Sequence, residues 1–138
     1  MSPSRPLPPN GLLPELVSRH FEEASFLWDV RRGAVDASHY TFADLARLDA
    51  RVEAHLDGLR VAGVGAEAII DEALCAAGAG ELFTATALAI ESGSDARLAP
   101  MLELARDTEA GVEAFVSAHS WLPWPRVAGR LGKLTALR

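Results

Sequence analysis

Histidines are the side chains of this sequence best suited to bind a metal ion, and there are four of them: His20, His39, His55 and His119. Two histidines that hold one zinc ion from a single helix typically lie four residues apart, and no pair here has that spacing. His20 and Glu23 are one helical turn apart, but a lone pair of this kind is usually found at a surface. We therefore expect no metal site. His55, at the margin of an apolar stripe, is expected to be partly buried with a satisfied hydrogen bond.

The residues that could act as nucleophiles or hold a phosphate lack the surroundings that such chemistry needs. Cys75 is the only cysteine and lies in an alanine-rich run, residues 73–77, which predicts a small buried apolar side chain. A Gly-x-Ser-x-Gly elbow does not occur. The glycines of 63–65 and 78–80 are typical of turns between helices and lack the lysine of a phosphate-binding loop. We expect a protein that is not an enzyme, has no catalytic residue and binds no cofactor.

The charge of the chain is acidic and unevenly distributed. Its formal net charge is −6, yet residues 126–138 carry +4, through Arg126, Arg130, Lys133 and Arg138, and hold no acidic residue. The remaining 125 residues therefore carry −10. An acidic body repels phosphate backbones, so we expect no nucleic-acid partner. The four cations are expected to form a solvated face.

The N-terminal segment and the hydropathy of the chain bear on where it acts. Residues 1–14 contain five prolines and little apolar surface, which predicts a disordered or extended leader. No apolar run approaches the ~20 residues of a membrane span, and the N-terminus lacks the apolar core of a signal peptide. A single cysteine cannot form an internal disulfide. These features predict a cytoplasmic protein without a membrane segment.

The elements that must position any site are helices, and the first two are predicted within residues 15–63. The first helix ends near Gly33, where basic residues precede the glycine. The second begins with a capping box formed by Thr41 and Asp44 and ends near Gly63. Its apolar residues recur at helical spacing and form a clean stripe: Leu45, Leu48, Val52, Leu56 and Leu59.

Residues 65–138 contain a pattern that repeats after about 28 residues. When the sequence is shifted by 28 residues, Ile70 aligns with Leu98. A further shift of 29 residues aligns Leu98 with Val127. A period near 30 built from two short helices is typical of helical solenoids, because one hairpin cannot bury its apolar face alone. For residues 15–138 we predict a single all-α domain in which HEAT-like helical-hairpin repeats, at 66–92 and 94–120, form a short right-handed α-solenoid.

This interpretation predicts the effect of Pro100 and the burial of individual side chains. Pro100 is expected either to place the start of its helix near Leu98 or to kink it. The stripes predict eight buried positions: Leu45, Leu48, Val52, Leu56, Leu74, Leu88, Leu102 and Val116.

The last predicted helix, from 126 to about 137, has an apolar stripe that no later helix covers: Val127, Leu131, Leu134 and Leu137. Exposed apolar patches tend to be interaction surfaces, so we predict self-association through this helix or its cover by a longer native chain. Tryptophan and arginine dominate interface energetics. The candidate partner-binding residues are therefore Trp121, Trp124, Arg126, Arg130 and Leu134, although the two tryptophans could instead pack between repeats.

Several stretches resemble a bacterial family of uncharacterised proteins with HEAT-like helical repeats, often encoded beside type VI secretion genes. They are His20-Phe-Glu-Glu-Ala-Ser-Phe-Leu-Trp28, His39-Tyr40, the run from Leu45 to Gly63, the run from Glu81 to Gly93, and Ser120-Trp-Leu-Pro-Trp124. The resemblance covers roughly residues 15–135, and members of the family are longer than this chain. It implies a fold and a genomic setting but no catalytic residues.

The function expected from these observations is a protein-binding scaffold. The resemblance implies an adaptor or immunity protein linked to type VI secretion, whose protein partner would be a secreted effector. An acidic solenoid suits a basic partner electrostatically. The alternative is an enzyme acting on nucleic acid, because some HEAT-like folds are base-excision enzymes. That alternative needs a basic groove, and the charge of residues 1–125 argues against one.

Overall fold

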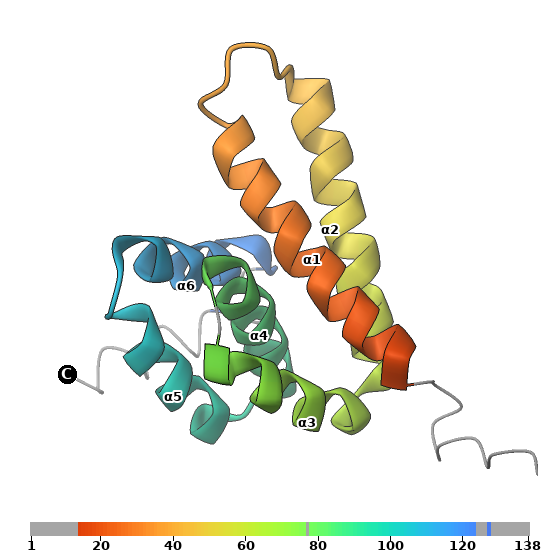
Figure 1. The fold of residues 1–138 in the computed structure, drawn as a ribbon, viewed down its shortest axis with the longest axis vertical. Helices are drawn as coiled ribbons and strands as arrows, with labels where there is room; N and C mark the ends of the chain where they lie inside the picture. The colour runs from red at the N-terminus through yellow and green to blue at the C-terminus, as the bar shows by residue number, and fades with distance from the viewer. Residues whose placement is uncertain (1–13, 77, 124–126, 128–138) are drawn as a thin grey trace, which may run out of the picture.

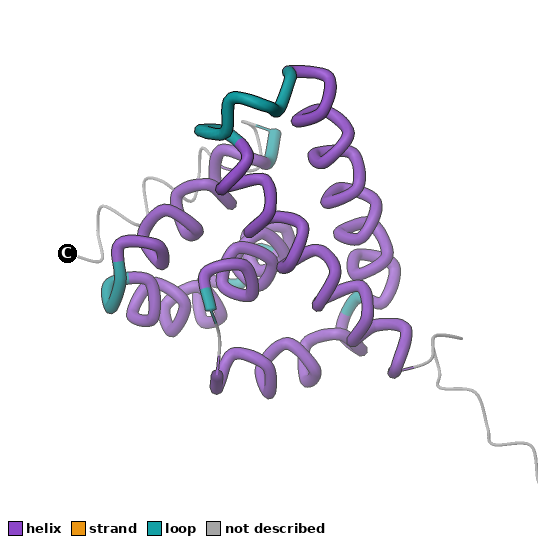
Figure 2. The backbone as a smooth tube through the Cα atoms, turned by 45° about the horizontal axis from the view of Figure 1, so that its top comes forward, coloured by secondary structure: helices purple, strands orange, loops and turns teal. Residues whose placement is uncertain are grey.

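The computed structural model describes residues 14–76, 78–123 and 127, and within them the chain is helical with no strand. Figures 1 and 2 show helices joined by short loops. The elements are α1 (Pro14–Ala34), α2 (Phe42–Ala62), α3 (Val64–Ala73), a short 3₁₀ turn (Leu74–Ala76), α4 (Ala79–Ser92), α5 (Asp95–Ala105) and α6 (Glu109–Trp121). The predicted all-α class is confirmed. The leader up to residue 13 and the last helix beyond Val127 lie outside the described residues.

The helices α1 and α2 form a long antiparallel hairpin, and Figure 1 shows its loop projecting away from the other helices. The predicted capping box is confirmed: the Asp44 amide donates to Thr41 Oγ1, and the Thr41 amide donates to the Asp44 carboxylate. The Thr41 amide, then the Arg47 guanidinium and the Thr41 hydroxyl, donate hydrogen bonds to the Asp44 carboxylate and lower its pKa to about 2. The helix ends where expected, at Gly63, whose φ of 55° favours glycine.

The helix α4 is the centre of the molecule. It packs against α1, α5 and α6, and most of its residues are buried on every side. Its crossing with α1 is close and polar: Ser25 Oγ lies 3.0 Å from Thr84 Oγ1, so one of the two hydroxyls donates to the other. Each hydroxyl also lies within hydrogen-bond distance of a carbonyl four residues earlier in its own helix. Gly80 lies at the same crossing, against the backbone of Ser25. Small side chains here let two helix backbones approach closely.

The expected hairpin of α3 and α4 does not form as a close pair. The helix α3 packs mainly against α1 and has few contacts with α4, whereas α5 and α6 pack against each other and both against α4. A pocket opens between α3 and α4 instead. The solenoid prediction is therefore not confirmed by this arrangement of the described helices.

The buried positions agree with the prediction in part. Leu48, Val52 and Leu56 are buried, while Leu45, Leu74, Leu88 and Leu102 are half-buried. The prediction for Val116 is wrong, because its side chain is 56% exposed. The helix α6 turns a different face to the core, made of Gly111, Ala114, Phe115, Ala118 and His119.

Two further local predictions need correction. Cys75 is exposed, because it lies in the 3₁₀ turn where the chain leaves α3 rather than in the interior of a longer helix. The helix α5 begins at Asp95, with the Ser94 hydroxyl as its cap, and continues through Pro100. No described helix is long and apolar enough to span a bilayer.

One buried hydroxyl of α4 gives a stability prediction. Thr86 is fully buried and, in the described part of the chain, its Oγ1 has no hydrogen-bond partner. Thr86→Val keeps the shape and removes the unsatisfied hydroxyl, so it should raise the free energy of unfolding by about 1 kcal/mol in urea denaturation. Thr84→Val is the matched control: its hydroxyl bonds Ser25 and the Gly80 carbonyl, so the same change should be destabilising. A loss of stability in Thr86→Val as large as in the control would contradict this account.

Candidate functional site

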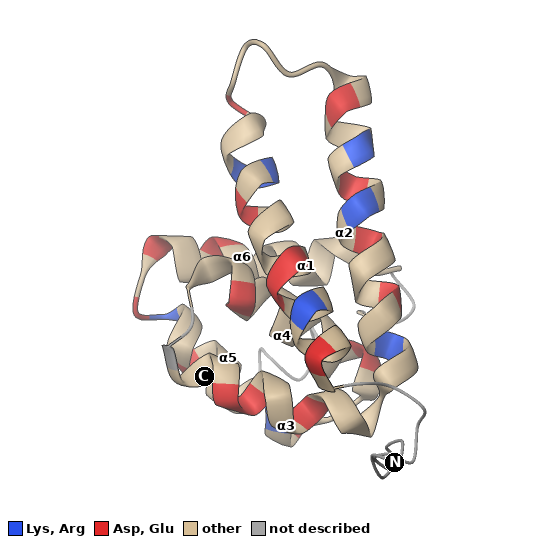
Figure 3. Cartoon of the chain, turned by 45° about the vertical axis from the view of Figure 1, so that its right-hand side comes forward, with Lys and Arg blue, Asp and Glu red and all other residues tan. Residues whose placement is uncertain are grey.

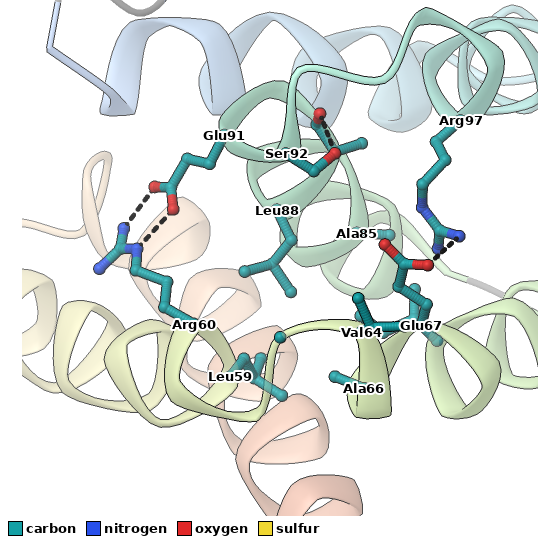
Figure 4. Close-up of a pocket in the computed structure, with 13 residues that line it drawn as sticks. Leu59, Arg60, Val64, Ala66, Glu67, Ala85, Leu88, Glu91, Ser92 and Arg97 are labelled. Carbon is teal, nitrogen blue, oxygen red and sulfur yellow. Dashed lines mark hydrogen bonds and ion pairs between the residues drawn. The ribbon is translucent and has the colours of Figure 1, made fainter. Parts of the chain in front are cut away.

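A pocket of about 290 Å³ lies between the end of α2, α3, α4 and the start of α5 (Figure 4). Its floor consists of buried apolar side chains from three helices: Leu59, Ala66, Ile70, Ala85 and Ala89. Leu88 is half-buried on one wall, and Val64 is 80% exposed. The pocket exists because Gly63 turns the chain from α2 into α3, which then diverges from α4.

An arginine network bounds the pocket on its α2 side. Arg60 donates to both oxygens of Glu91, at 2.7 Å each, and its Nη1 also donates to Glu53 and Asp57. The bond to Glu91 is the main cause that raises the pKa of Arg60, and it outweighs the opposing effect of burial. Arg60 therefore stays charged, and it joins α2 to α4 by a bidentate ion pair.

A second arginine bounds the opposite side, as Figure 4 shows. Arg97, near the start of α5, donates to Asp71 at 2.8 Å and lies 3.5 Å from Glu67, both on α3. The side chains of Asp71 and of Asp57 are 60% and 67% exposed. Two guanidinium groups thus bind five carboxylates, of which Glu67 and Glu91 line the pocket, whereas Glu53, Asp57 and Asp71 are held beside it by the arginines. The rim is negative although the floor is apolar.

The described residues that line this pocket include few groups of the kind that act as nucleophiles. Among the described residues that line it, Ser92 is the only one with a hydroxyl; the residue is exposed, and its Oγ donates to the Ala89 carbonyl. A serine without a neighbouring base is a poor nucleophile. No group of three or more histidines, cysteines and acids in the described ranges could hold a metal ion. The geometry offers an apolar hollow with fixed charges around it.

Trp121 is the one sequence-predicted partner residue that the structure describes. It is half-buried, and its Nε1 donates to Glu53 at 2.8 Å. Its ring lies edge-on to Phe83, and the Arg31 guanidinium sits 5.6 Å from the ring centre. Trp121 thus connects α6 with α1, α2 and α4. Glu53, which accepts its hydrogen bond, also accepts one from Arg60. Four predicted residues lie outside the described part of the chain: Trp124, Arg126, Arg130 and Leu134.

The structure brings together two histidines that sequence reasoning had kept apart. His20 Nδ1 lies 3.0 Å from His55 Nδ1, across α1 and α2, so one ring donates and the other accepts. The predicted partial burial and hydrogen bond of His55 are confirmed. The two residues lie at similar distances from the loop of the hairpin, and this symmetry could have revealed the pair. His119 bonds a carbonyl of its own helix, and the His39 ring contacts Tyr40.

This histidine pair predicts an acid-sensitive stability. Burial, then the charge of His20, lowers the pKa of His55 from 6.5, with Arg51 adding to the shift and Glu23 opposing it. As pH falls below 6.5 the unfolded chain takes up this proton before the folded chain does, so the free energy of unfolding decreases from pH 7 towards pH 5. His55→Gln should flatten that decrease in denaturation curves measured at each pH. His39→Gln, at an exposed position, is the control and should keep the wild-type curve.

Comparison of the chain with protein-family models, with curated proteins and with solved structures gave no match. The resemblance named from the sequence stays a prediction. The geometry and charge of the chain itself are therefore the observations that bear on its function.

Proposed function

We propose that this chain is a non-enzymatic protein-binding module and that the pocket between α3 and α4 is part of its binding surface. The observation that carries the proposal is the combination of an apolar floor with a negative rim. Exposed apolar side chains beside a hollow favour association, because burying them removes them from water. The pocket contains no arrangement that would favour catalysis instead.

The charge of the helices around the pocket favours a basic partner. Residues 64–123 hold ten acidic side chains and two basic ones, Arg97 and Arg106. Figure 3 shows mainly acidic charged positions along α3, α5 and α6, where Arg97 of α5 is the one Lys or Arg, whereas α2 carries several residues of each sign. Complementary charge speeds the encounter with a basic protein and disfavours acidic ones.

We extend the proposal to the biological setting that the sequence resemblance implies. The module would act in bacterial cytoplasm as an adaptor or immunity protein linked to type VI secretion, and its partner would be a secreted effector. We also propose that the repeats of residues 66–134 belong to a HEAT-like solenoid. What supports this extension is the repeated apolar pattern of residues 66–134.

The test is a pull-down from the native host with mass spectrometry, using the wild type and two charge-neutralised variants. Asp57→Asn with Asp71→Asn removes two carboxylates beside the pocket. Glu103→Gln with Glu113→Gln removes two exposed carboxylates away from it. Both variants change the net charge equally. We expect the first to reduce recovery of the partner about tenfold and the second to keep it within about twofold. An equal loss in both, or no recovered partner, would contradict the proposal.

A further inference from the structure

We infer that the pocket between α3 and α4 receives one apolar side chain of a partner segment that carries lysine or arginine on both sides of that residue. This inference rests on the proposed function and specifies the chemistry of the partner at the same site. Its basis is the size of the pocket, the apolar floor, and the two exposed carboxylates that bind the arginines on its opposite sides.

The size of the pocket favours a side chain over an enclosed small molecule. Ligand sites for drug-sized molecules have volumes of about 300–1,000 Å³ and bury most of the ligand. This pocket has about 290 Å³ and is bordered by exposed residues, Val64 and Ser92. Such a hollow suits the end of a leucine, methionine or phenylalanine that reaches in from a bound segment, in the manner of an interface anchor.

The floor determines that the entering group is apolar. Leu59, Ile70 and Ala89 are each at most 3% exposed. These apolar side chains offer no hydrogen-bonding group to a polar ligand. The surface that an apolar group would cover belongs to the half-buried Leu88 and the exposed Val64. An entering polar group would lose its bonds to water without replacing them at this floor.

The negative rim determines the charge of the partner residues on either side of the apolar anchor. The guanidinium groups of Arg60 and Arg97 are already engaged by carboxylates, so neither is poised to receive an anionic ligand. Each arginine forms an ion pair with an exposed carboxylate: Arg60 with Asp57 on α2, and Arg97 with Asp71 on α3. A carboxylate can accept several hydrogen bonds at once, so each can also bind a lysine or arginine of a partner. A segment crossing the pocket would meet one acid on either side of its anchor.

The inference is tested with three fluorescently labelled peptides of equal length and fluorescence anisotropy. The first has a central leucine with two lysines on either side; the second replaces the leucine with serine; the third replaces the lysines with glutamate. We expect the first peptide to bind at least tenfold more tightly than either of the others. Equal binding of the first two would overturn the inference, because charge alone would then explain the interaction.

Two matched variants locate the binding on the protein. Ser92 and Ser120 are both exposed serines near helix ends whose hydroxyls bond a carbonyl of the same helix, and only Ser92 lines the pocket. Ser92→Trp should fill the mouth of the pocket and weaken the first peptide at least tenfold, whereas Ser120→Trp should leave its affinity within about twofold. An equal effect of both would overturn the inference. If circular dichroism shows that Ser92→Trp is not folded, Val64→Gln replaces it and should also weaken binding of the first peptide at least tenfold.

The peptide measurements and the pull-down can fail independently, so a failure of this inference is distinguishable from a failure of the proposed function. If none of the peptides binds preferentially while the pull-down still depends on Asp57 and Asp71, the module binds its partner through the acidic rim alone and this inference fails. If the first peptide binds through the pocket and the host yields no partner, the pocket chemistry stands and the proposed function fails.

Discussion

Gly80→Ala is expected to lower the free energy of unfolding by about 3 kcal/mol. An added Cβ would lie closer than 3.0 Å to the Ser25 carbonyl oxygen and to an oxygen of Asp29, and the former belongs to the backbone of α1. Neither α1 nor α4 can move away cheaply, because their crossing is held by the Ser25–Thr84 hydrogen bond. Urea denaturation followed by circular dichroism measures the loss.

Gly33→Ala is the matched control for this substitution. Gly33 lies in α1 and a Cβ added there would meet nothing within 4 Å. Because alanine favours the helix over glycine, Gly33→Ala should leave stability unchanged or raise it by up to about 1 kcal/mol. If Gly80→Ala were as benign as Gly33→Ala, the close crossing of α1 and α4 would be wrong.

Leu56→Ala is expected to cost about 2–5 kcal/mol. The Leu56 side chain is 0% exposed and belongs to the continuous core formed by the helices. Removing most of it leaves a cavity whose walls relax only in part. Val61→Ala in the same helix is the comparison, since Val61 is 74% exposed and should change stability by less than about 0.5 kcal/mol. A change in Leu56→Ala within error would place that face of α2 in solvent.

Local signals in the sequence were sufficient for the helices themselves. Thr41 and Asp44 cap α2, and Gly63 ends it, as their chemistry predicts. The structure also shows Ser94 and Thr108 capping α5 and α6, a role that serine and threonine favour. Each of these signals depends only on neighbours within one turn, so no knowledge of the tertiary fold was needed.

The packing of the helices could not be obtained in the same way. A 28-residue repeat of apolar positions is compatible with any series of amphipathic helices, and it does not say which helices touch. The sequence of α4 did contain a usable signal: it is apolar on nearly every side, which is typical of a central helix rather than one member of an outer hairpin. The 28-residue displacement also aligns Leu88 with Val116, and because it takes no account of this difference between helices it predicts the wrong face of α6.

The candidate site was also outside the reach of sequence reasoning. Arg60 and Glu91 are 31 residues apart, and Arg97 and Asp71 are 26 apart, so their pairing depends on how α2, α3, α4 and α5 meet. The candidates chosen from the sequence were tryptophans and arginines near the C-terminus. Of these, the structure places Trp121 against the core, where its indole supports the charged network beside the pocket.

The central claim is that this chain binds a protein partner over the pocket between α3 and α4. It is tested most directly by photo-crosslinking in the native host, with a photoreactive residue at position 64 or at position 116. Both positions are exposed valines, and only Val64 lines the pocket. We predict a discrete crosslinked adduct from position 64 that disappears when Ser92→Trp is added, and none from position 116. An adduct from position 116 alone, or none from either position, would contradict the account.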